Sequence, residues 1–205
     1  MDLETFKQKF QSYSGLVLVF FIALHLSGIV FAGINPDAFE IYASKLHSSI
    51  FLPYLEIVLA ISFIMHIFLT LNKVLKNRLS GNTALLRTSR NDFIGVLASK
   101  VQPITGIILT CFLLIHLFQL RVPRPINNLE LASLKGSLEG NHILVLYSLA
   151  SISLCFHMLH GIESGHRSLG ILNQSNSLKI RYIGRFISVL FGLSYLIMTV
   201  YFRFN

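Results

Sequence analysis

Four histidines carry the chemistry that this chain can offer inside its apolar segments. His25, His66, His116 and His157 each lie in a different segment that is long enough to span a membrane. A histidine at membrane depth is costly and rare, which makes each of them a candidate functional residue. Neutral imidazole is a common axial ligand of haem iron. Four such residues in four segments therefore predict two bis-histidine haem sites.

The segments that must position these histidines are five apolar runs. They cover roughly residues 15–34, 51–72, 101–120, 143–162 and 183–202. A helix of about 20 residues crosses about 30 Å of hydrocarbon. With 53% apolar residues, 13% charged residues and a mean hydropathy of +0.65, the chain leaves no room for a soluble catalytic module. We predict an all-α integral membrane protein with one membrane domain over residues 1–205, in which the first four of five transmembrane helices form a haem-binding bundle.

The first apolar run differs from a cleaved signal peptide. Its apolar part is longer than usual and Phe31-Ala32-Gly33 is a poor cleavage site, so we expect the run to be retained. Cys111 and Cys155 lie inside apolar runs and form no Cys-x-x-Cys-His motif. This excludes covalent c-type haem attachment, and the two thiols are interpreted as small apolar residues.

Lysine and arginine are distributed unequally between the two sides of the membrane. The N-terminal stretch and the second and fourth loops together carry twelve, whereas the opposite side carries five. The positive-inside rule then places the N-terminus in the cytoplasm and the C-terminus outside. The net charge of +8 follows mostly from this bias, and nothing in the sequence indicates nucleic-acid binding.

This orientation sorts the four histidines into two layers. His25 and His116 lie eight and five residues before the outer ends of the first and third runs, which is roughly 7–12 Å from the outer boundary. His66 and His157 lie seven and six residues before the inner ends of the second and fourth runs, roughly 9–11 Å from the inner boundary. The layers predict an outer haem on His25 and His116 and an inner haem on His66 and His157, within a four-helix bundle.

A short motif occurs twice at the same distance from a histidine. Ser14-Gly15-Leu16 precedes His25-Leu26 by eight residues, and Thr105-Gly106-Ile107 precedes His116-Leu117 by eight residues. Ten residues of helix rise about 15 Å, so each glycine reaches the inner histidine layer. We interpret Gly15 and Gly106 as making room for the inner porphyrin, with ordinary helix–helix packing through small residues as the alternative.

The other four histidines are weaker candidates. His47 and His142 sit at or near the outer interface, and His166 sits at the inner interface beside Arg167. His160 is the competitor of His157 because the two lie on adjacent faces of one helix. Spacing alone leaves both open.

Motifs along nearly the whole chain carry a family resemblance. They are Ser14-Gly15 through His25, Met65-His66, Leu86-Arg87-Thr88-Ser89-Arg90-Asn91-Asp92, Val101-Gln102-Pro103-Ile104-Thr105-Gly106 through His116-Leu117, Phe156-His157-Met158-Leu159-His160-Gly161, and Leu169-Gly170. With them the chain resembles the cytochrome b membrane anchor of succinate:quinone and quinol:fumarate oxidoreductases, in its single-subunit, five-helix, di-haem form. In that family a ligand histidine lies four residues before a glycine of the fourth helix, which matches His157 and Gly161 and favours His157 over His160.

The resemblance implies a function and partners. Such an anchor holds an iron–sulfur subunit and an FAD-containing flavoprotein subunit on the cytoplasmic side of a bacterial cytoplasmic membrane. Two haem b groups carry electrons between that side and a quinone site near the outer haem, and menaquinone is the preferred quinone. The chain is then an enzyme only as the quinone-reactive electron-transfer subunit, because no dicarboxylate active site lies in it. The direction, succinate oxidation or fumarate reduction, stays open.

Two carboxylates and three arginines are the candidates for supporting roles. Quinone chemistry moves protons, and Glu56 in the second run and Glu40 in the first outer loop are the acids on the outer side that we consider for proton transfer. An interfacial carboxylate without chemistry is the alternative for each of them. Arg87, Arg90 and Arg167 are candidates for holding the propionates of the inner haem by charge-assisted hydrogen bonds. Positive-inside topology explains the same three arginines.

Two rival functions remain on the sequence alone. One is the di-haem cytochrome b subunit of a hydrogenase or formate dehydrogenase, against which the repeated Ser/Thr-Gly motif argues. The other is a haem-free membrane anchor or transporter. Transporters often have helices interrupted near mid-membrane, whereas Pro53 and Pro103 are expected near the starts of their helices, where proline is tolerated.

Overall fold

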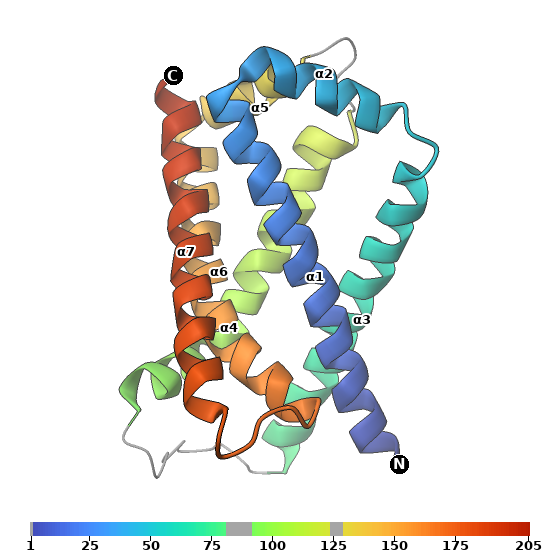
Figure 1. The fold of residues 1–205 in the computed structure, drawn as a ribbon, viewed down its shortest axis with the longest axis vertical. Coiled ribbons are helices and arrows are strands. Elements are labelled where there is room, and N and C mark those ends of the chain that lie inside the picture. The colour runs from blue at the N-terminus through green and yellow to red at the C-terminus, as the bar shows by residue number, and fades with distance from the viewer. Residues whose placement is uncertain (1, 81–91, 124–128) are drawn as a thin grey trace.

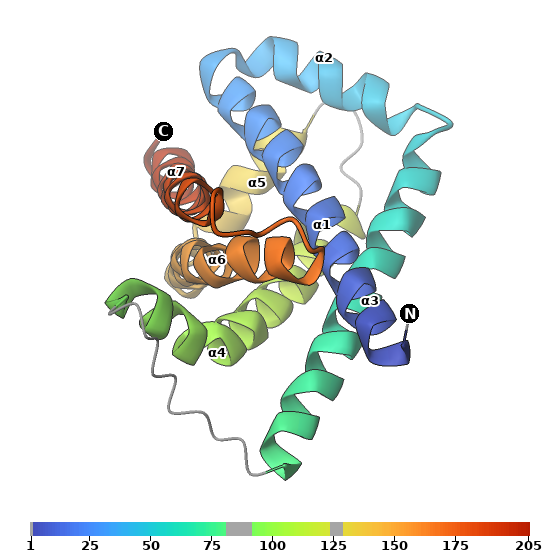
Figure 2. The ribbon, with the colours of Figure 1, turned by 60° about the horizontal axis from the view of Figure 1, so that its bottom comes forward.

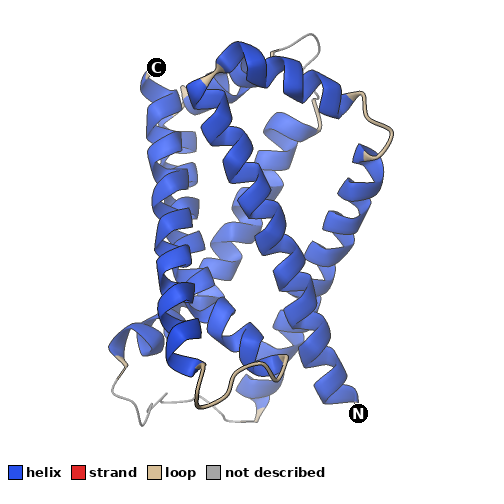
Figure 3. Cartoon of the chain, in the orientation of Figure 1, coloured by secondary structure: helices blue, strands red, loops and turns tan. Residues whose placement is uncertain are grey.

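The computed structural model describes residues 2–80, 92–123 and 129–205, and all regular structure in these ranges is helical. Figures 1 and 3 show the arrangement. The elements in chain order are α1 (Leu3–Ile34), α2 (Pro36–His47), α3 (Leu52–Leu79), α4 (Phe93–His116) with its π-helical continuation η1 (Leu117–Arg121), α5 (Glu130–Leu138), α6 (Asn141–Ser168) and α7 (Ser177–Phe204).

Five of these helices are long and apolar enough to cross a membrane, which confirms the predicted all-α, multi-pass fold. They are α1, α3, α4 with η1, α6 and α7. Each is longer than its predicted run because polar and charged residues at the ends continue the helix. The two termini lie at opposite ends of the bundle (Figure 1), as an odd number of spans requires. We call the end with the N-terminus the N-face and the end with the C-terminus the C-face.

α6 is the central helix of the bundle. It packs against α7, α4 and α1, and α1 packs in addition against α3. Figure 2 shows α6 between α7 and α4, and α1 between these helices and α3. Large apolar side chains such as Phe20, Ile64 and Ile107 stay more than 60% exposed. Exposed apolar side chains along spanning helices are what a lipid environment accommodates.

Two short helices at the C-face were not predicted. α2 and α5 are 12 and 9 residues long and carry too many polar residues to stand out as apolar runs. α2 begins at Pro36, and the side chain of Asn35 accepts a hydrogen bond from the Ala38 backbone amide at 3.1 Å. Asparagine as N-cap followed by proline is a strong signal for the start of a helix. The start of α2 could therefore have been predicted, although the helix itself was not.

The expected position of Pro103 was wrong. α4 begins at Phe93, where Asp92 caps the helix by accepting a hydrogen bond from the Gly95 amide at 3.2 Å. Pro103 therefore lies inside α4. Proline in a helix interior removes one backbone hydrogen bond, and membrane helices tolerate this. The argument against a transporter that was drawn from proline placement no longer holds for Pro103.

An ion-pair network ties α4, α6 and α7 together at the N-face. The Arg185 guanidinium donates to both carboxylate oxygens of Asp92 at 2.5 and 2.7 Å. Arg181 lies between two acids, 3.6 Å from Asp92 and 3.3 Å from Glu163. Arg181, Asp92 and Glu163 are each less than a quarter exposed, so these pairs are screened less than surface pairs.

This network makes stability at the N-face depend on pH. The hydrogen bond from Arg185 holds the pKa of Asp92 below its ordinary value of 3.8. A lowered pKa stabilises the fold at neutral pH, and that stabilisation is lost as the pH falls through the folded-state pKa. We expect Asp92→Asn to cost about 1–3 kcal/mol at pH 7 and to lower the midpoint of thermal unfolding in detergent. The difference from the unmodified chain should shrink towards pH 3.

Asp37→Asn is the matched control for this prediction. Asp37 also lies in the first turn of a helix, and no ion pair joins it to any described residue. Its replacement should leave the unfolding midpoint nearly unchanged at both pH values. Equal effects of the two substitutions would contradict the role of the network.

Candidate functional site

The structure brings the four predicted histidines together as two facing pairs. His25 of α1 faces His116, the last residue of α4, with 6.0 Å between ring centres and 78° between ring planes. His66 of α3 faces His157 of α6 with 6.3 Å between ring centres and 66° between ring planes. The first pair lies toward the C-face and the second toward the N-face. The rings that meet are thus the ones that the sequence paired: the first apolar run with the third, and the second with the fourth.

Both pairs bridge helices that do not pack closely on each other. Among the four histidine-bearing helices, in the described ranges, the extensive contacts are α1 with α3, α1 with α6 and α4 with α6, and neither α1 with α4 nor α3 with α6 is one of them. Each pair therefore reaches across the bundle. The backbones of the two helices in each pair are therefore separated. A group held by both rings would need such a separation.

The ring separations would allow both imidazoles of a pair to bind one metal ion. A metal–nitrogen bond is about 2.0–2.1 Å long and the ring centre lies about 1 Å behind the nitrogen, so two imidazoles on opposite sides of an ion would have centres roughly 6–6.5 Å apart. Both pairs fall in this range. No group of three or more His, Cys, Asp or Glu among the described residues could hold a bare ion. Haem iron needs only two protein ligands because the porphyrin supplies the other four.

Each histidine of the N-face pair has its Nδ1 atom against the repeated Ser/Thr-Gly motif. His66 Nδ1 lies 3.4 Å from Ser14 Oγ and 3.4 Å from the Gln11 carbonyl oxygen. His157 Nδ1 lies 3.4 Å from Thr105 Oγ1. The motif was noticed for its distance to His25 and His116, but its contacts are with the histidines of the other layer.

The two motif glycines lie directly beside the same imidazole rings. A Cβ atom on Gly15 would be 3.2 Å from His66 Cε1, and one on Gly106 would be 3.5 Å from His157 Cε1. The first distance is tighter than an ordinary contact and the second is an ordinary contact. The glycines thus reach the predicted layer, and the group for which they make room in this structure is the imidazole edge.

The C-face pair is held by aromatic side chains. Phe21 stacks on His25 and Phe112 stacks on His116, with ring centres 5.5 and 5.4 Å apart. The Tyr147 hydroxyl lies 3.0 Å from His116 Nδ1. Sequence reasoning missed these contacts. A phenylalanine four residues before each of the two histidines was the available signal.

The contact with Tyr147 occupies the Nδ1 edge of His116. Nε2 is then the ring nitrogen that would be left for a metal.

Two buried amide oxygens lie one helix turn from Thr105 and from His116 in the sequence. Gln102 Oε1 and Gln119 Oε1 are buried and have no hydrogen-bond partner among the described residues. Gln102 lies one turn before Thr105, and Gln119 lies one turn after His116. A buried polar atom without a partner costs free energy. Both fit a site that is completed by a group from outside the chain.

His160 is not part of either pair. It lies one turn closer to the N-face than His157, near the charged groups of Lys73, Glu163 and Arg167. The structure thus places His157 opposite His66 and leaves His160 beside the pair. Two of the three remaining histidines have other partners: His166 donates to the Ile162 carbonyl at 2.8 Å, and His47 lies 2.8 Å from Glu130.

The two acid candidates have different surroundings. Glu56 of α3 forms a part-buried ion pair with Arg121 at the end of η1. Glu40 of α2 accepts hydrogen bonds from the backbone amides of Glu130 and Leu131 at 3.2 and 2.8 Å, and so caps the N-terminus of α5. Glu40 therefore has a structural role as a helix cap. This role was not predicted because α5 itself was not predicted.

The arginine candidates are only partly covered by the structure. Arg167 pairs with Glu163 at 3.1 Å on the same helix, which is an ordinary surface contact. Arg87 and Arg90 lie outside the described residues.

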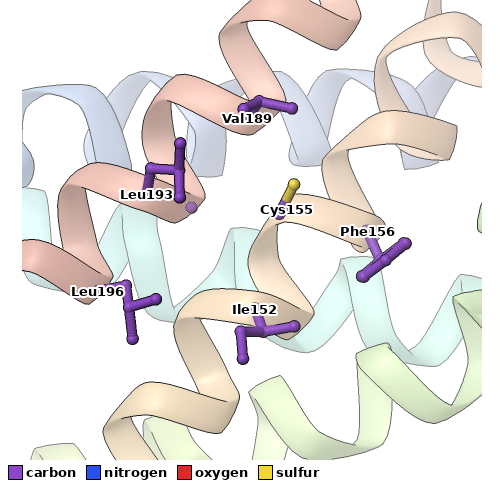
Figure 4. A pocket seen from close by; sticks show the side chains of 7 residues that line it. Ile152, Cys155, Phe156, Val189, Leu193 and Leu196 are labelled. Carbon is purple, nitrogen blue, oxygen red and sulfur yellow. The ribbon is translucent and has the colours of Figure 1, made fainter.

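Two hollows lie near the bundle surface, and no histidine lines either. One of about 280 Å³ is lined by Ser27, Gly28, Phe31 and Tyr42 between α1 and α2. The other, of about 200 Å³, is an apolar groove between α6 and α7. Figure 4 shows Ile152, Cys155 and Phe156 of α6 on one side of it and Val189, Leu193 and Leu196 of α7 on the other. Apart from the thiol of Cys155, the side chains that line this groove are apolar.

Comparisons with protein-family models, curated proteins and solved structures give no match to this chain. Its function is therefore argued from the two histidine pairs and their surroundings.

Proposed function

We propose that this chain is the membrane-anchor cytochrome b of a succinate dehydrogenase or fumarate reductase complex. It carries electrons through two bis-histidine haem b groups between an iron–sulfur subunit and a membrane quinone. The observation that carries the proposal is the pair of imidazole couples, His25 with His116 and His66 with His157, whose ring centres lie 6.0 and 6.3 Å apart. These four histidines would hold the two haem groups. Haem iron supplies one-electron redox chemistry when bound.

The two levels of histidines suit transfer across a membrane. A single carrier at one level would leave most of a layer of about 30 Å to cross, whereas one pair toward each face divides the distance. The surrounding side chains hold the rings: Phe21 and Phe112 by stacking at the C-face level, Ser14 and Thr105 by contact with Nδ1 at the N-face level.

The excess of lysine and arginine supports a cytoplasmic N-face. The iron–sulfur subunit and its FAD-containing flavoprotein partner would dock there, and the His66–His157 pair is the one nearer to them. Dicarboxylate chemistry would take place in the flavoprotein. The chain itself would be located in a bacterial cytoplasmic membrane with its C-terminus outside.

Quinone would react toward the C-face, where proton exchange needs a titratable group. Glu56 is the better of the two acid candidates because it forms an ion pair with Arg121. Arg121 is the last residue of η1 and lies only five residues after His116. Glu40 is committed to capping α5. Menaquinone remains the preferred quinone on the family resemblance alone.

The test is the haem stoichiometry of the chain purified with its co-purifying subunits, from the pyridine haemochrome and the reduced-minus-oxidised spectrum. We expect two b-type haems per chain, and one in each of the variants His25→Ala and His66→Ala. A flavin and iron–sulfur signal in the co-purified subunits would identify the dicarboxylate complex.

Two results would overturn parts of the proposal separately. Absence of haem, or full haem content in both variants, would remove the cytochrome function. Two haems together with a partner that carries another metal centre in place of flavin would keep the cytochrome and favour the hydrogenase or formate dehydrogenase type.

A further inference from the structure

We propose that Ser14 and Thr105 are positioning residues that fix the proton of His66 and His157 on Nδ1, so that Nε2 of both rings is free to bind iron. The inference rests on the proposed haem function. It assigns to the repeated motif a role that its spacing to His25 and His116 did not suggest.

The direction of each hydrogen bond follows from the partners of Ser14. Its hydroxyl donates its one hydrogen to the Gln11 carbonyl at 2.8 Å, so toward His66 it can only accept. The second neighbour of His66 Nδ1 is the Gln11 carbonyl oxygen, which is also an acceptor only. Two acceptors at 3.4 Å share one N–H in a three-centre arrangement. Nδ1 must therefore carry the hydrogen.

The second half of the chain repeats this arrangement. Thr105 donates to the Gln102 carbonyl at 3.0 Å, and His157 Nδ1 lies 3.4 Å from its hydroxyl oxygen. Because its hydrogen is on the Gln102 carbonyl, Thr105 Oγ1 can only accept toward His157. Hydroxyl and histidine are 52 positions apart in both halves. Glutamine three residues before the hydroxyl, and glycine directly after it, complete the match.

A purely structural role would not need this geometry. Serine and threonine in membrane helices often donate to a carbonyl of the preceding turn without any further partner. Thr110 does so toward the Gly106 carbonyl at 2.8 Å. Ser14 and Thr105 differ because both are 6% exposed and both meet a histidine ring of the adjacent helix on its Nδ1 edge. The adjacent Gly15 and Gly106 allow that approach.

The chemical consequence concerns the strength of the iron ligand. A histidine that donates its second N–H to an acceptor is a more basic ligand in a fixed orientation, and loss of such an acceptor typically weakens metal binding about 10–100-fold. A less basic ligand stabilises the oxidised iron less, so the reduction potential of that haem should become more positive.

The experiment compares Ser14→Ala/Thr105→Ala with the exchange variants Ser14→Thr and Thr105→Ser, which keep a hydroxyl. Haem content after detergent washing, the low-spin electron paramagnetic resonance signals and a redox titration are measured for both haems. In the alanine double variant we expect about 10–100-fold weaker retention of the His66–His157 haem, a more positive potential and a shifted low-spin signal. The exchange variants and Thr110→Val should behave like the unmodified chain.

The His25–His116 haem serves as the internal control for folding. If it stays unchanged while the other haem changes, the bundle is assembled and the hydroxyls position the ligands. Unchanged signals of both haems in the double variant would overturn the inference. Equal loss of both haems would also overturn it, because the hydroxyls would then serve assembly. An unmodified chain without any haem would instead refute the proposed function.

Discussion

His157→Ala is expected to reduce the haem content from two to one per chain, whereas His160→Ala should retain both haems. His157 faces His66 with 6.3 Å between ring centres, so alanine would leave iron with one protein ligand at that level. His160 lies one turn away among charged side chains at the N-face. Pyridine haemochrome analysis of the two purified variants measures the difference, and the low-spin signal that survives in His157→Ala should be that of the His25–His116 pair.

The paired variants also test which nitrogen-bearing side chain of α6 binds iron. The two histidines are three residues apart on one helix, so helix propensity and membrane insertion change equally in both variants. One haem in His160→Ala and two in His157→Ala would show that α6 presents the other face to α3. In that case the described His66–His157 couple would be only a ring contact.

Gly192→Ala is expected to destabilise the bundle strongly. A Cβ atom on Gly192 of α7 would lie 2.6 Å from Cys155 Cβ and 3.1 Å from the Ser151 carbonyl oxygen of α6. These neighbours belong to the backbone or are fixed to it, so no side-chain rotation relieves the overlap and the two helices must move apart. Overpacking of this kind costs about 1–3 kcal/mol. We expect a lower midpoint of thermal unfolding in detergent, measured by circular dichroism.

Gly165→Ala is the matched control on α6. Nothing lies within 4 Å of the position of its Cβ atom, and alanine is favoured over glycine in a helix interior by roughly 0.5–1 kcal/mol. The control should therefore be as stable as the unmodified chain or slightly more stable. An unchanged midpoint in Gly192→Ala would mean that α6 and α7 are not packed as closely as the structure has them.

Much of this architecture could be predicted because the decisive quantity is length along a helix. Apolar runs of membrane length predicted the five spanning helices that the structure contains. The rise per residue assigned His25 and His116 to one level and His66 and His157 to the other, which are the couples that face each other. The depth of a residue in the membrane can be predicted from the sequence and the direction of each helix alone.

Rotation and short polar elements could not be predicted in this way. Whether His157 or His160 faces His66 depends on how α6 is turned, and that follows from packing against α7, α4 and α1 together. The contact of Tyr147 with His116 depends on the same rotation. Glu40 gained its capping role only because α2 and α5 meet at the C-face, and neither helix has the apolar signature by which the spanning helices were found.

Both histidine couples join helices that are not consecutive along the chain. This sets the order in which the two sites can be completed during synthesis. The first two spanning helices carry His25 and His66, which belong to different couples, so a nascent chain that has inserted only α1 and α3 has neither site. The couple at the C-face is complete once His116 has left the ribosome, and the couple at the N-face only after His157 has followed. Under the proposed function, the C-face site could bind its haem after the third spanning helix has been inserted, and the N-face site only after the fourth. A chain truncated between the two would then bind one haem in place of two.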